Sequence, residues 1–133
     1  IPHEDTIWLE CTSQRSPFAY LGSFTEGRDV LLIKPNNQSK LAKTPGLKCK
    51  NNLRLRKAKV KIDINSNAKA DIEMQYKGIY FDDKRTVFYY EGKRRMDMVR
   101  NNIHINNFSL NDETYSIEEI KGDLPSLIEK YNV

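Results

Sequence analysis

Apolar and polar residues alternate along several short stretches of the chain, which is the pattern of half-buried β-strands. Residues rich in Gly, Pro, Asn and Asp separate these stretches every eight to twelve residues. The predicted strands are residues 6–11, 30–34, 48–64, 70–76, 79–81, 86–92, 95–99, 102–110 and 113–120. This spacing predicts a mostly β fold, an antiparallel β-sandwich or barrel.

The C-terminal segment follows a different period. Residues 123–132 begin with Asp123, a good N-cap residue, and place an apolar set at helical spacing. This set is Leu124, Leu127, Ile128 and Tyr131. The pattern predicts a short C-terminal helix that closes an open end of the sheet.

The longest predicted strand lies in the stretch NNLRLRKAKVKIDIN, residues 51–65. Its apolar positions change phase by one residue between Arg56 and Lys57. A strand keeps a period of two, so the phase change predicts a β-bulge that leaves both halves facing the core. The basic side chains would then share the solvent face, and residues 70–76 would complete a hairpin.

The chain has 133 residues and a mass of 15.5 kDa, which fits one domain, residues 1–133, with one core. Hydrophobic residues make up 38 % and aromatic residues 10 % of the chain, which argues against disorder. No apolar run approaches the roughly 18 residues of a membrane span, so no span is expected.

The net charge of +4 comes from one segment of the chain. Seven basic and no acidic residues lie between Lys48 and Lys61, and the rest of the chain has 15 basic against 18 acidic residues. This basic strand, residues 48–61, has three interpretations: a solvated face that protects a sheet edge, a docking surface for an acidic protein or glycan, or a polyanion-binding or nucleic-acid-binding face. No aromatic residues that would stack on bases are interleaved, so nucleic acid is not the expected partner.

A second basic group contains Arg94 and Arg95. These residues are either charges of a turn or arginines offered to carboxylates of a partner, which a guanidinium binds in a bidentate way.

No catalytic motif occurs in the chain, so we expect a protein that is not an enzyme and uses no cofactor or metal. His3 lies near the terminus, and His104 lies between Ile103 and Ile105 in a predicted strand. Such histidines are usually structural or exposed. An enzyme built on His104 and nearby acids is the alternative.

The two cysteines, Cys11 and Cys49, lie in segments that both look β-like. In an oxidising compartment they would form a disulfide worth about 3–4 kcal/mol. The alternative is a pair of unrelated buried thiols. The chain begins at Ile1 without Met, which either an arbitrary boundary of the sequence or removal of a secretory signal would explain. Together these features predict a Cys11–Cys49 disulfide in an exported protein.

A small β-rich chain with one disulfide, an N-terminal IWLEC strand and a late NIHINNFSL strand resembles bacterial periplasmic proteins. The resemblance is to bacteriocin immunity proteins of the pesticin-immunity type and to related periplasmic lysozyme inhibitors. It implies a non-catalytic periplasmic or secreted protein that blocks a toxin or wall hydrolase of muramidase type.

Some of these inhibitors carry a Ser-Gly-containing loop, and this chain has no Ser-Gly dipeptide, so their contact residues are not carried over. A muramidase cleft holds carboxylates that basic side chains can engage. The candidate contacts are Arg54, Arg56, Lys59, Lys61, Arg94 and Arg95.

Overall fold

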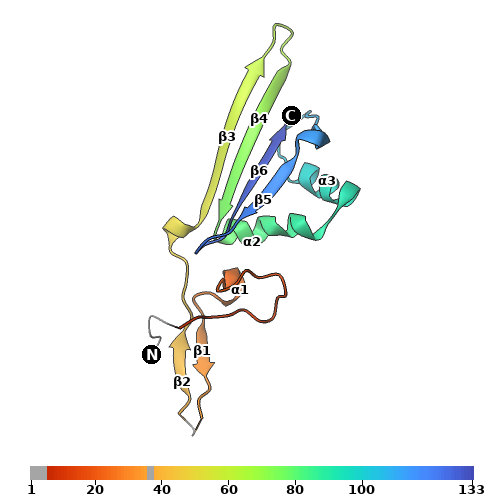
Figure 1. The fold of residues 1–133 in the computed structure, drawn as a ribbon. Helices are drawn as coiled ribbons and strands as arrows, with labels where there is room; N and C mark the ends of the chain where they lie inside the picture. Colours follow the sequence, from red (N-terminus) through yellow and green to blue (C-terminus); the bar gives the residue numbers. More distant parts are fainter. Residues whose placement is uncertain (1–5, 36–37) are drawn as a thin grey trace. The chain divides into compact units, whose positions relative to one another are not determined.

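A computed structural model describes residues 6–35 and 38–133 (Figure 1). Contacts divide the chain into two compact units, residues 1–52 and 53–133, and each is described by itself. The expectation of a single domain over residues 1–133 stays a prediction. Ile1 and His3 lie outside the described residues.

The first unit is a short antiparallel hairpin with little regular structure around it. Strands β1 (Asp29–Leu32) and β2 (Lys40–Lys43) pair directly, and two short helices, α1 (Gly22–Thr25) and η1 (Cys49–Asn51), complete the unit. The prediction of a strand at residues 30–34 is confirmed by β1. The prediction of a strand at residues 6–11 is wrong, because this segment runs as irregular chain.

Buried Thr44 fixes the base of this hairpin. Its hydroxyl donates to the carbonyl of Thr25 over 2.7 Å and accepts from the backbone N–H of Arg28 over 2.8 Å. One side chain therefore satisfies polar groups on two neighbouring segments, which a buried hydroxyl must do to avoid a desolvation penalty.

The predicted Cys11–Cys49 disulfide is not formed. Both cysteines are free and exposed. Cys11 lies in irregular chain and Cys49 begins the η1 turn, so no strand ladder brings the two residues together. The alternative of buried thiols is also wrong for both residues.

The second unit contains an open four-stranded antiparallel sheet in the order β3-β4-β6-β5. Its strands are β3 (Leu53–Ile62), β4 (Ala68–Lys77), β5 (Ser116–Ile120) and β6 (Ser126–Asn132). The predicted hairpin is confirmed, with β3 pairing β4 from Leu53 opposite Lys77 to Ile62 opposite Ala68. This register is continuous, so the predicted bulge between Arg56 and Lys57 is wrong.

Helices occupy residues for which strands were predicted. Helix α2 (Ile79–Arg85) is followed by η2 (Thr86–Tyr89) and α3 (Gly92–Asn101), and η3 (Asp112–Thr114) precedes β5. Gly78 has a φ of 62°, a left-handed conformation that lets the chain turn from β4 into α2. The predicted strand at 102–110 is a loop.

The helices α2 and α3 lie on the same side of this sheet (Figure 1). The side chains of β4 that are buried, Ile72, Met74 and Tyr76, alternate with more exposed ones, so one face of the sheet belongs to the core. Phe81 of α2 and Val99 of α3 complete this core. Full burial of each such apolar side chain contributes about 1.5–3 kcal/mol.

The predicted C-terminal helix is wrong, because residues 126–132 form β6 between β4 and β5. Leu127 and Tyr131 are four residues apart, which places them on one face of a helix and also on one face of a strand. A central strand gains hydrogen bonds on both sides, and this favours the strand.

The predicted β-rich character is confirmed in part, as antiparallel strands in two sheets with short helices. A closed barrel or a sandwich is not confirmed: β3 and β5 are the free edges of the larger sheet. Among the described residues, no helix has the length and apolar character needed to cross a membrane.

Candidate functional site

Strand β3 divides the predicted contact residues between two faces. Residues opposite each other in the ladder share a face, and successive residues alternate. Arg54 is opposite Tyr76 and Arg56 is opposite Met74, so both arginines lie on the core face. The Nε of Arg56 lies 3.3 Å from the sulfur of Met74.

The lysines of β3 lie on the other face. Lys59 is opposite Asp71, and Lys57 forms an ion pair with Glu73 over 3.5 Å. Lys130 of β6 also approaches Glu73, at 3.7 Å. These carboxylates therefore offset part of the positive charge of this face. The face is less suited to binding a phosphate backbone than a purely basic face would be.

Arg94 and Arg95 belong to α3 and not to a turn. The guanidinium of Arg94 lies 4.4 Å from the ring centroid of Tyr90. The Nε of Arg95 donates to the carbonyl of Tyr90 over 2.6 Å. The structure therefore does not bring the six candidate contacts into one patch, and their role as contacts stays a prediction.

The distal end of the β3–β4 hairpin projects beyond the rest of the second unit (Figure 1). Strand β6 pairs with β4 only as far as Asp71, and Ala70 exchanges two backbone hydrogen bonds with Val133. We call residues 61–69, which lie beyond this pairing, the hairpin tip. Every residue of the hairpin tip is exposed, and Ile64 is 100 % exposed.

Asp63 holds the turn of the hairpin tip in one conformation. Its carboxylate accepts from the backbone N–H groups of Asn65 and Asn67 over 2.8 and 2.9 Å and from the side-chain amide of Asn67 over 3.1 Å. The hydrogen bonds from Asn67 hold the pKa of the Asp63 carboxyl below its usual range. The tip is therefore pre-organised although it is fully solvated.

A buried carboxylate lies on the core face of the sheet, in the middle of β6, opposite Met74 of β4. Glu129 of β6 is 2 % exposed and accepts from the hydroxyls of Tyr76 and Tyr115 over 2.8 and 3.0 Å. The ammonium of Lys84, with a side chain that is 11 % exposed, lies 2.6 Å from the carboxylate. We call these four side chains the Glu129 network.

Burial, followed by the negative charge of Glu129, raises the pKa of Tyr76 and of Tyr115 well above the usual range of a tyrosine. The same two causes raise the pKa of Tyr131. The hydroxyls of Tyr76 and Tyr115 are therefore fixed as donors to the carboxylate.

A pocket of about 200 Å³ opens beside the Glu129 network. Buried Tyr76 and largely buried Lys84 line it, together with half-buried Tyr80. The remaining lining residues are exposed: Arg54, Asp83, Asn102 and His104. His104 was expected to be structural or exposed, and it is exposed in a loop.

Sequence reasoning missed most of this pocket. Arg54 and His104 are far apart in the sequence, which gives no sign that they line the same pocket. Residues 79–81, at the start of the helix that carries Tyr80 and Asp83, were predicted as a strand. Buried Glu129 was also missed. The available signal was its position midway between Leu127 and Tyr131, both of which are buried on the same face.

Within residues 6–35 and 38–133, no group of three or more His, Cys, Asp or Glu side chains is placed to hold a metal ion. No protein-family model matches the chain, and neither a curated protein nor a solved structure matches it.

Proposed function

We propose that the protein is a non-catalytic, exported binding protein that blocks a wall-degrading toxin of muramidase type by inserting its hairpin tip into the acidic cleft of the enzyme. The observation that carries this proposal is the projection of a fully exposed, pre-organised hairpin tip beyond the sheet. Its place of action would be the periplasm or the outside of the cell, where such enzymes act.

The two faces of the hairpin tip differ in a way that suits a cleft. Lys61 and Lys69 are directly opposite each other on one face, where like charges are destabilising. Ile62, which is 74 % exposed, is opposite Ala68 on the other face. Carboxylates of a partner would relieve the repulsion between the lysines, and apolar contact would cover the isoleucines.

The energetics fit an inhibitor. A muramidase cleft holds a pair of carboxylates, and close charge pairs in protein interfaces have coupling energies of about 1.5 kcal/mol or more. Because Asp63 already holds the turn, little conformational entropy is lost when the tip binds. A rigid tip with two lysines can therefore supply a large part of the affinity.

Inhibition of purified muramidases on a peptidoglycan suspension tests the proposal. The double variant Lys61→Glu/Lys69→Glu should weaken inhibition more than about tenfold. The matched control Lys93→Glu/Lys121→Glu changes the net charge equally at exposed positions outside the tip and should retain inhibition. Equal losses in both variants would contradict a role for the tip.

Apolar contact at the tip is tested separately. Ile64→Asn should weaken inhibition, whereas Ile120→Asn, at another exposed position in the second unit, should not.

The rival function is polyanion or nucleic-acid binding by the basic strand, residues 48–61. Salt-dependent binding of oligonucleotides, with no inhibition of any muramidase, would favour this rival.

A further inference from the structure

The pocket beside the Glu129 network contains one cation and one anion that do not neutralise each other. Arg54 and Asp83 both line it, and neither side chain forms a hydrogen bond or an ion pair with the described residues. Arg54 comes from β3 and Asp83 from α2, so separate rigid elements hold the two charges.

Lys84 does not supply the missing partner for Asp83. Its ammonium is 2.6 Å from the Glu129 carboxylate and 5.5 Å from the ring centroid of Tyr76, so both of these contacts lie within the Glu129 network. Glu129 offsets the charge of Lys84. The charges left for a ligand are the positive Arg54 and the negative Asp83.

We propose that this pocket binds a small zwitterion of the α-amino-acid type. The guanidinium of Arg54 would bind the carboxylate in a bidentate way, and Asp83 would bind the ammonium. Asn102 and His104 add polar groups at the mouth, and the Tyr80 side chain adds an aromatic wall. A pocket of about 200 Å³ favours a compact ligand over a drug-sized one.

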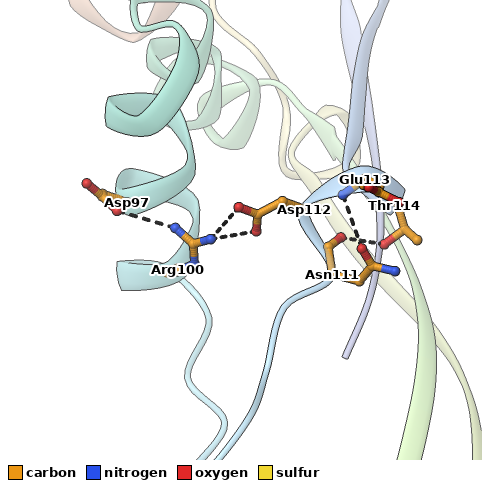
Figure 2. A network of polar contacts seen from close by, with 6 residues as sticks. All are labelled: Asp97, Arg100, Asn111, Asp112, Glu113 and Thr114. Carbon is orange, nitrogen blue, oxygen red and sulfur yellow. Dashed lines mark hydrogen bonds and ion pairs between the residues drawn. The ribbon is translucent and has the colours of Figure 1, made fainter.

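The loop that carries Asn102 and His104 is held at both ends. Figure 2 shows Arg100, at the end of α3, between Asp97 and Asp112. Its Nη1 lies 3.3 Å from Asp97, and its Nη2 donates to the carboxylate of Asp112 over 2.6 Å. This clamp fixes the ends of the loop and so the mouth of the pocket.

Titration of the full chain with alanine, acetate and methylamine, followed by NMR shifts and calorimetry, tests the zwitterion. Alanine should bind and shift amides around Arg54, Asp83 and His104. Acetate and methylamine each satisfy only one of the two charges, so each should bind at least about tenfold more weakly. Equal binding of acetate and alanine would overturn the proposal.

Variants separate the pocket from general electrostatics. Arg54→Gln and Asp83→Asn should each weaken alanine binding at least about tenfold. Lys121→Gln and Asp123→Asn make the same charge changes at exposed positions elsewhere and should not alter it. An unchanged affinity in Asp83→Asn, or shifts confined to residues outside the pocket, would refute the site whether or not the protein inhibits a muramidase.

Discussion

The Glu129 network allows a quantitative prediction about stability. Glu129→Gln keeps the shape of the side chain but removes the negative charge beside the ammonium of Lys84, only 2.6 Å away. Both groups are nearly buried, and removal of one partner of a buried ion pair costs about 3–5 kcal/mol. A domain of this size has only about 5–15 kcal/mol of unfolding free energy, so this variant should lose a large part of it.

Lys84→Met removes the other partner. Glu129 would then keep its two tyrosine donors, Tyr76 and Tyr115, but lose its charged partner. We expect a loss of about 1.5–3 kcal/mol, the energy of a hydrogen bond to a charged group. The double variant Glu129→Gln/Lys84→Met should be less destabilised than the sum of the two single variants by about 1–3 kcal/mol. The reason is that the double variant leaves no unpaired charge in the core.

The assay has to report on the second unit. The only tryptophan, Trp8, lies in the first unit, so its fluorescence is unsuitable. Hydrogen exchange at the amides of β4 and β6 measures the opening free energy of the sheet itself. Strictly additive effects, or a loss below about 1 kcal/mol in Glu129→Gln, would refute the buried ion pair as a source of stability.

Three further predictions concern the buried tyrosines, the Arg100 clamp and the two cysteines. The raised pKa values of Tyr76 and Tyr115 mean that their contribution to stability is complete below pH 10, the ordinary tyrosine value, and is lost as the pH rises above it. In alkaline denaturation the free energy of unfolding should fall by about 1.4 kcal/mol per pH unit for each of the two tyrosines. Replacement of both by Phe should reduce this slope. Arg100→Ala should reduce stability by only about 1 kcal/mol, because the clamp is partly exposed, yet weaken alanine binding in the NMR titration. Alkylation without reductant should modify both Cys11 and Cys49, as shown by intact mass, and resistance of both thiols would indicate a disulfide after all.

Local sequence patterns predicted the β3–β4 hairpin well. Both strands alternate over many residues, and Asn65, Ser66 and Asn67 provide a turn between them. Long alternation with a turn signal is specific, because a helix would place the same residues on all sides. The pattern did not reveal the phase correctly, since the register runs through Arg56 and Lys57 without a bulge.

The helices were missed because short apolar runs suit more than one period. In residues 95–99, Met96 and Met98 alternate as in a strand, whereas Arg95 and Val99 are spaced as in a helix, and tertiary packing of Val99 favours the helix. Strand β6 was missed for a similar reason. The charged residue Glu129 occupies a core position, which breaks the alternation of apolar and polar residues expected of a strand. The pocket depends on these misassigned elements, so it could not have been predicted from the sequence.

Strand β3 links the two proposed sites without coupling them. Arg54, in the pocket, and Lys61, in the hairpin tip, are seven positions apart on one strand and so lie on opposite faces and about 23 Å apart. Substitutions at that distance with no shared partners usually add. Alanine binding should therefore be the same in Lys61→Glu/Lys69→Glu as in the wild type, and muramidase inhibition the same in Arg54→Gln. Loss of inhibition in Arg54→Gln would mean that the predicted basic contacts act as one surface despite their separation, and that the pocket is part of the partner interface.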